Sequence, residues 1–129
     1  MRQERGTLAY YQELFELAPG AYIVTDGHLV IEDANSAAVR LFRTPFDELL
    51  GKPLLMFVEG GERTVFRTMV TESLIARKQL VQPLSLEPVP GAVEDVLYSA
   101  CVVHDEKGNV SAIHWLFIEG FEGRQGDLV

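Results

Sequence analysis

The chain has 129 residues, of which 47% are hydrophobic and 23% are charged, and these proportions predict one globular domain with its own core. A formal net charge of -8 argues against nucleic acid and anionic membranes as partners, because both bind basic surfaces. The single cysteine excludes an intrachain disulfide framework, and no signal peptide or run of about 18 apolar residues is visible, so a cytoplasmic location is expected.

The N-terminal part of the chain predicts a helix followed by a hairpin. Apolar residues recur at spacings of three and four from Thr7 to Ala18, which is typical of an amphipathic helix, and Pro19-Gly20 ends it. The run from Ala21 to Thr25 predicts a strand. Asp26-Gly27 then predicts a tight turn into a second strand from His28 to Ile31.

Helices are predicted for the middle of the chain. Asn35 is a strong N-cap residue and predicts a helix from Ser36 to about Arg43. Residues 44–51 predict a single capped turn, and Glu62 to Lys78 predict the longest helix, because apolar residues form a stripe along it. The stripe comprises Val65, Phe66, Met69, Val70, Leu74 and Ile75.

After Gln79 the hydrophobic period changes to two, which predicts strands. A strand through Leu84 and Leu86 is followed by a loop from Pro88 to Gly91, a strand over residues 96–103, a hairpin turn at residues 105–108 and a last strand over residues 110–118. Strands segregated from helices and joined by hairpins indicate an α+β fold with an antiparallel sheet.

Four segments resemble the PAS family in their order and spacing, over roughly Glu13 to Glu119. They are Leu17 to Gly27, Asp33 to Ala38, Asp47 to Pro53 and His104 to Val110. The resemblance implies a PAS fold: a five-stranded antiparallel sheet of order 2-1-5-4-3, helices on one face, and an N-terminal amphipathic helix. It divides the chain into residues 1–20 (a dimerisation or capping helix), 21–119 (the PAS core) and 120–129 (a C-terminal linker).

The resemblance also places a candidate ligand pocket between the sheet and the helices. Its residues are Ile23, Thr25, Val39, Leu54, Phe66, Val70, Leu84, Leu86, Tyr98, Trp115 and Phe117. The inward set of strand residues follows from alternation once one member is placed. These side chains either fill the space themselves or line a site for an unidentified small apolar ligand, for which Thr25 and Tyr98 are the polar handles.

Known PAS cofactors do not match these positions. Flavin-binding light sensors of the family use a reactive cysteine where this chain has Pro53-Leu54. They use hydrogen-bonding residues where it has Leu86, Val96 and Phe117, and buried ring edges without partners cost about 1–3 kcal/mol each. Haem-binding relatives place a histidine on the long helix, which has none here, and the histidines and cysteine lack metal-ligand spacing. No cofactor or metal is therefore expected.

The opposite face of the predicted sheet is apolar too, although exposed faces of antiparallel sheets are usually polar. A cover is therefore expected, from the N-terminal helix, from a second copy of the chain, or from both. The candidate homodimer interface comprises Leu8, Tyr11, Leu14, Phe15, Tyr22, Val24, Leu116 and Ile118.

These features favour a non-catalytic PAS sensory and dimerisation module of a bacterial-type signal-transduction protein, such as a histidine kinase of a two-component system, with the output domain outside this chain. One alternative is a receptor domain for a small apolar ligand. A distant alternative is a small enzyme on a cone-shaped α+β scaffold, which needs a carboxylate or histidine pointing into the cavity, and the inward set contains neither.

Overall fold

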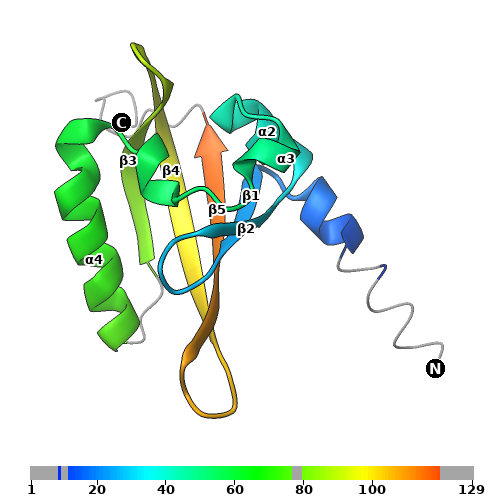
Figure 1. The fold of residues 1–129 in the computed structure, drawn as a ribbon, viewed down its shortest axis with the longest axis vertical. Coiled ribbons are helices and arrows are strands. Elements are labelled where there is room, and N and C mark those ends of the chain that lie inside the picture. The colour runs from blue at the N-terminus through cyan, green and yellow to red at the C-terminus, as the bar shows by residue number, and fades with distance from the viewer. Residues whose placement is uncertain (1–8, 10–11, 77–79, 120–129) are drawn as a thin grey trace, which may run out of the picture.

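One antiparallel sheet with helices on one face forms the body of the molecule (Figure 1). A computed structural model describes residue 9, residues 12–76 and residues 80–119. The strands are β1 (Ala21–Thr25), β2 (Ile31–Ala34), β3 (Leu80–Val89), β4 (Ala92–His104) and β5 (Val110–Glu119). Their order, β2-β1-β5-β4-β3, confirms the predicted topology and fold class.

The helical layer comes from the segment between β2 and β3. It contains α2 (Ser36–Phe42), α3 (Phe46–Leu49) and α4 (Arg63–Ala76), with 3-10 turns η1 (Leu54–Phe57) and η2 (Gly60–Glu62). The predicted apolar stripe on α4 is wider than its buried face. Phe66 and Val70 are buried against the sheet, whereas Val65 and Ile75 are 61% and 78% exposed. The predicted helix end at Lys78 lies outside the described residues.

The connection between β1 and β2 is longer than the predicted two-residue hairpin. β2 begins at Ile31, so the preceding residues from His28 belong to the turn and not to the strand. The positive φ falls on Leu29, at 69°, and not on the Asp-Gly pair. The carboxylate of Asp26 accepts hydrogen bonds from the N–H groups of His28 (2.8 Å) and Val30 (3.0 Å), and these bonds hold the wider turn.

The connection between β3 and β4 is tighter than predicted. Pro88 belongs to β3, so the predicted four-residue loop shrinks to Pro90-Gly91, with φ of Gly91 at 85°. A proline followed by a residue of positive φ suits a two-residue turn. The strand register shifts between Leu86 and Val89, which accommodates a proline that has no N–H to donate.

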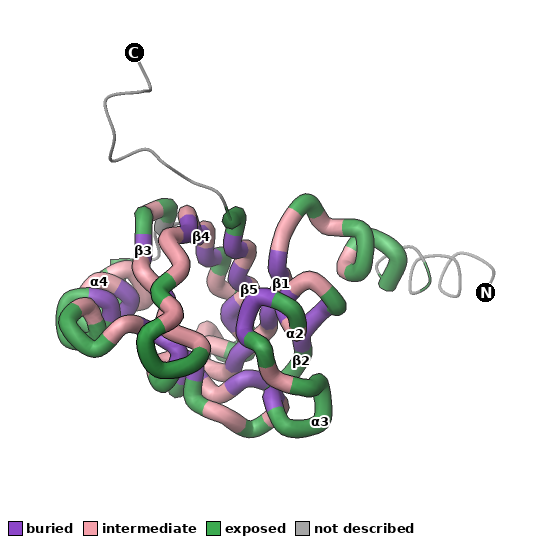
Figure 2. Tube along the Cα trace, turned by 90° about the horizontal axis from the view of Figure 1, so that it is seen from above, coloured by how far each residue is buried: buried purple, intermediate pink, exposed green. Residues whose placement is uncertain are grey.

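The N-terminal helix is confirmed where the structure describes it, at Ala9 and residues 12–17. Figures 1 and 2 show it projecting sideways beside β1 and α2, at the edge of the sheet and not across it. Leu14 and Leu17 are 47% and 76% exposed. Of the four helical residues assigned to a dimer interface, the structure describes Leu14 and Phe15, whereas Leu8 and Tyr11 lie outside the described residues.

Asn35 joins this helix to β1 and α2. Its side chain is completely buried, and its Oδ1 accepts hydrogen bonds from the N–H groups of Tyr22 and Ala38, both at 2.9 Å. Its Nδ2 donates to the carbonyls of Phe15 (2.8 Å) and Gly20 (3.2 Å). An amide has two donors and one oxygen with two acceptor sites, so every hydrogen-bonding position of this side chain is used.

We expect Asn35→Ala to lower the free energy of unfolding by about 3 kcal/mol. The variant loses the N-cap of α2 and leaves several backbone groups in a buried place without a partner, each at a cost of about 1–3 kcal/mol. Urea unfolding measures the change. Ser36→Ala is the control, because Ser36 is the exposed next residue and bonds only to the Glu16 carboxylate. Equal losses in the two variants would contradict the assignment.

Candidate functional site

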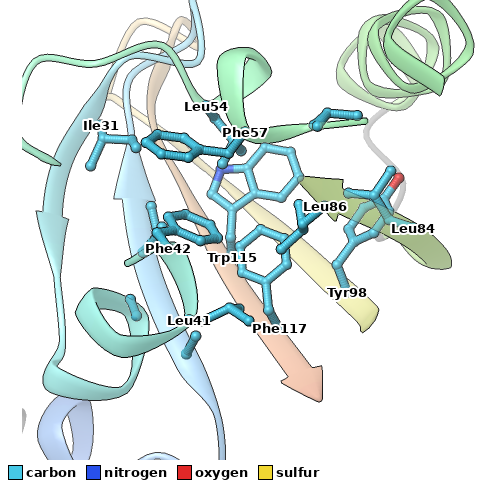
Figure 3. Close-up of a cluster of buried hydrophobic side chains, with 14 of the residues drawn as sticks. Ile31, Leu41, Phe42, Leu54, Phe57, Leu84, Leu86, Tyr98, Trp115 and Phe117 are labelled. Carbon is cyan, nitrogen blue, oxygen red and sulfur yellow. The ribbon is translucent and has the colours of Figure 1, made fainter. Parts of the chain in front are cut away.

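Aromatic rings occupy the space between the sheet and the helices, where the sequence predicts either a self-filled core or a site for a small apolar ligand (Figure 3). The aromatic cluster consists of Phe66, Tyr98, Trp115 and Phe117. The ring centroid of Phe66 lies 5.3 Å from that of Tyr98 and 5.7 Å from that of Trp115. Trp115 stacks on Phe117 at 6.3 Å with an interplanar angle of 7°. The chain therefore fills much of this space with its own side chains.

The candidate pocket residues are all buried except Val39, which is half-buried. Val39 packs against the edge of the core and also lines a groove beneath the N-terminal helix, together with Phe15 and Phe46. Phe66, Leu84 and Tyr98 line a second groove, between α4 and β3, and Val70 lines a third, between α4 and η1. None of these three grooves is lined by Trp115 or Phe117.

Thr25, one of the two predicted polar handles, is occupied within the core. Trp115 donates its Nε1–H to the Thr25 Oγ1 at 3.0 Å, and the Thr25 hydroxyl donates to the carbonyl of Asp26 at 2.9 Å. A buried tryptophan N–H needs an acceptor, and this requirement could have been foreseen from an inward tryptophan beside an inward threonine. The threonine hydroxyl therefore has no donor left for a ligand.

Tyr98, the other handle, is free of such a bond. Its side chain is only 1% exposed, and its hydroxyl has no hydrogen-bond partner within the described part of the chain. No described polar atom is both shut off from solvent and unpaired, so this hydroxyl retains access to the groove between α4 and β3. Burial raises the pKa of Tyr98 to about 12, which keeps the hydroxyl protonated.

The positions that hold flavin in light-sensing relatives are buried and apolar. Four side chains at these positions are completely buried and pack in the core cluster: Leu54, Leu86, Val96 and Phe117. These positions offer no hydrogen bond to the polar edge of a ring system. On α4, where haem-binding relatives carry a histidine, residues 63–76 contain none.

The outer face of the sheet, opposite the helices, is the second apolar surface. Its residues along the middle of the three central strands are Tyr22, Val24, Leu97, Ser99, Cys101, Val103, Ala112, His114, Leu116 and Ile118. Asp95, nearer the start of β4, lies on the same face and accepts a hydrogen bond from the Ser85 hydroxyl at 2.8 Å. Val103 and Ile118 are 41% and 40% exposed, and Cys101 is exposed as well. From the N-terminal helix, Phe15 packs on Tyr22 with ring centroids 4.8 Å apart.

A tyrosine–histidine pair lies on this outer face. The Tyr22 hydroxyl and His114 Nδ1 are 2.8 Å apart, which confirms that His114 points away from the interior. Burial, with a smaller contribution from Cys101, raises the pKa of Tyr22, so its hydroxyl stays protonated. Burial lowers the pKa of His114 and favours the neutral ring, whose tautomer sets which of the two groups donates this hydrogen bond.

Residues 9, 12–76 and 80–119 contain neither a metal-binding cluster nor a membrane-spanning helix. Within these ranges no three His, Cys, Asp or Glu side chains lie close enough to hold a metal ion together. No helix in the same ranges has both the length and the apolar character that crossing a bilayer requires.

Comparison with known proteins gives one consistent family. A family model described as PAS fold matches residues 15–120. No curated protein sequence matches the chain.

Solved structures with the same fold share little sequence with this chain. A PAS domain from Colwellia psychrerythraea has a TM-score of 0.80 at 15% identity, covering 88% of this chain and 96% of that one. A PAS domain of a LuxR-family transcriptional regulator from Burkholderia thailandensis has a TM-score of 0.71 at 20% identity, covering 85% and 96%. A domain of a sensor histidine kinase/response regulator from Geobacter sulfurreducens has a TM-score of 0.72 at 18% identity, covering 88% and 94%. LOV proteins are also similar.

Replacing Thr25 tests the internal hydrogen bond of the core. We expect Thr25→Val to lower the free energy of unfolding by about 1–3 kcal/mol, because the buried Trp115 N–H loses its acceptor while the side-chain volume is kept. Thr25→Ser is the matched control, since it keeps the oxygen and loses one methyl group, at about 1 kcal/mol. Urea unfolding followed by the fluorescence of Trp115 measures both. A valine variant more stable than the serine variant would refute the account.

The histidine on the outer face predicts a pH dependence of stability. Folding lowers the pKa of His114, so as the pH falls the unfolded chain takes up a proton at a higher pH than the folded chain does. The contribution of this residue to the free energy of unfolding is therefore at its full value above about pH 6.5, the pKa of a free histidine. It declines as the pH falls from there toward the folded pKa. We expect the stability difference between wild type and His114→Gln to shift against wild type on acidification, in urea titrations at several pH values. Other groups cancel in this difference, so a flat or opposite trend would contradict the burial of the neutral ring.

Proposed function

This chain belongs to the PAS family, and we propose that it is a non-catalytic sensory and dimerisation module whose outer sheet face binds a second copy of the chain. PAS domains of a sensor histidine kinase and of a LuxR-family regulator are among the similar structures, which supports a role in signalling. In this proposal the module belongs to a longer cytoplasmic protein and passes its signal to an output domain, such as a histidine kinase or a transcriptional regulator. The uncovered apolar face carries the proposal.

The distribution of charged side chains on the outer face favours a second copy of the chain as the molecule that covers this face. A chain of net charge -8 repels its own copy unless the touching surfaces are free of carboxylates. The outward positions of β1, β5 and the centre of β4 carry no acidic or basic side chain other than His114. Two carboxylates of this face, Asp33 beside Val24 and Asp95 beside Ser85, lie at its margins. A twofold dimer pairs this patch with itself, so it needs no complementary charge. Nucleic acid and membranes are not expected partners, because they require a basic face.

The N-terminal helix adds to the proposed interface. It stands beside β1 and α2, toward the β2 edge of the sheet (Figure 2), and its Leu14 and Leu17 side chains are 47% and 76% exposed in the single chain. A second copy placed on the outer face would cover these leucines together with Leu116 and Ile118. Burial of apolar area at roughly 25 cal/mol per Å² would then stabilise the dimer and the helix together.

The interior supports a module without catalysis. Three buried side chains of the described residues carry hydrogen-bonding groups that bear on this question. Those of Thr25 and Asn35 are occupied by internal hydrogen bonds, and the raised pKa of Tyr98, about 12, keeps its hydroxyl protonated. General acid–base catalysis needs a group with a pKa near the working pH, and none of these three provides one. We also propose that the module works without flavin, haem or metal, supported by the apolar side chains at Leu86, Val96 and Phe117.

Replacing Ile118 with glutamate tests the proposed dimer. We expect Ile118→Glu to convert the dimer to a monomer at high micromolar concentration, as measured by light scattering, because the interface cannot desolvate a charge without a partner. The variant keeps its fold, since this side chain is 40% exposed in the single chain. Ile75→Glu is the matched control, on α4 and 78% exposed, and it should remain dimeric. A monomeric wild type at this concentration would sink the proposal.

A further inference from the structure

The groove between α4 and β3 contains a polar group that the fold does not use. The Tyr98 side chain lies almost wholly inside the protein, and its hydroxyl has no partner among the described residues. In Figure 3 this hydroxyl points away from the rings of Trp115 and Phe117, toward the side of α4. Because this hydroxyl reaches the groove and is not sealed from solvent, it is available to an external hydrogen-bond partner in place of water.

The walls of the groove are apolar and its size suits a small molecule. Phe66 and Met69 of α4 face Leu84 of β3, and Tyr98 of β4 closes the inner side. The volume of the groove is about 300 Å³. Small-molecule sites begin at about this volume and combine apolar walls with a few polar groups that fix the orientation of the ligand.

The charges around the groove exclude an anionic ligand. Glu62 lines the rim, where its carboxylate accepts a hydrogen bond from the N–H of Ser85 at 2.9 Å. No lysine, arginine or histidine lines the groove. A carboxylate ligand would therefore lose its hydration without gaining a cationic partner, and it would be repelled by Glu62.

The state of the Tyr98 hydroxyl defines the polar part of the ligand. Since it stays protonated across the physiological range, it can donate a hydrogen bond, which suits a ligand with an acceptor oxygen. We propose that this groove binds a small neutral molecule that presents one carbonyl or hydroxyl oxygen to Tyr98 and an apolar body to Phe66, Met69 and Leu84. The proposal rests on the sensory role given above and names the class of signal.

The position of Tyr98 connects this site with the outer face of the sheet. Tyr98 lies on β4 between Leu97 and Ser99, whose side chains point to the opposite face. Its ring also contacts Phe66 of α4 and Trp115 of β5, with centroids 5.3 and 5.8 Å apart. A ligand that moves the Tyr98 ring therefore acts on the same strand segment that a second copy would contact.

Amide NMR titrations with three related probes test the site. Cyclohexanone offers a neutral acceptor, cyclohexanecarboxylate offers an anion, and methylcyclohexane offers no acceptor. We expect cyclohexanone to shift the amide signals of Met69, Gln82, Leu84 and Tyr98 saturably, and to bind more tightly than the other two. Tyr98→Phe should weaken cyclohexanone binding about threefold to tenfold, because one neutral hydrogen bond is lost.

Thr68→Val is the control, since it removes an exposed hydroxyl from α4 that lies outside both the groove and the outer face, and it should leave the affinity unchanged. Thermal unfolding checks the fold: Tyr98→Phe should be at least as stable as wild type, because the hydroxyl it loses has no internal partner. Absence of saturable shifts at the groove, equal affinity of Tyr98→Phe, or tighter binding of the carboxylate would each overturn the proposal. Light scattering measures the mass in solution independently of the titration. A chain that is monomeric but binds cyclohexanone would therefore refute the dimer and leave the ligand site standing.

Discussion

The side chain of Asn35 is the interaction on which the arrangement of the molecule depends. Its four hydrogen bonds fix the end of the N-terminal helix, the start of β1 and the first turn of α2 at one buried point. Because the carbonyl of Phe15 is bound there, the helix is held beside the sheet and does not fold across it. Of the described part of this helix, Phe15 packs on Tyr22 at the margin of the outer face, while Val103 and Ile118 on that face stay 41% and 40% exposed.

Much of the fold follows from patterns that are local in the sequence. Alternation placed the inward residues of β1, β4 and β5 on the buried side, and the N-cap preference of asparagine located the start of α2. The wider β1–β2 turn was missed because the Asp26 carboxylate binds backbone groups two and four residues away, which a dipeptide pattern does not contain. The exposure of Val65 and Ile75 was missed because periodicity gives the direction of a face but not its width.

The candidate site depended on contacts between residues far apart in the chain, and here the sequence was less informative. Inward aromatic residues were foreseen, but the sequence alone left open whether they line a cavity or fill it. The structure shows that Trp115 uses Thr25 as its acceptor, 90 residues away, and that Tyr98 has no such partner. The hydroxyl that is available to a ligand, that of Tyr98, therefore lies at the groove between α4 and β3, whereas aromatic rings fill the centre of the interior.

The central claim is that a second copy covers the outer face of the sheet, and the native thiol of Cys101 reports on this directly. Cys101 is the only cysteine of the chain, is exposed, and pairs with His114 across β4 and β5 on that face. The measurement is the rate constant of its reaction with an aromatic disulfide reagent as a function of protein concentration. The account predicts a rate constant that falls as the dimer forms, because association buries the thiol. A rate constant independent of concentration up to the high micromolar range would contradict it.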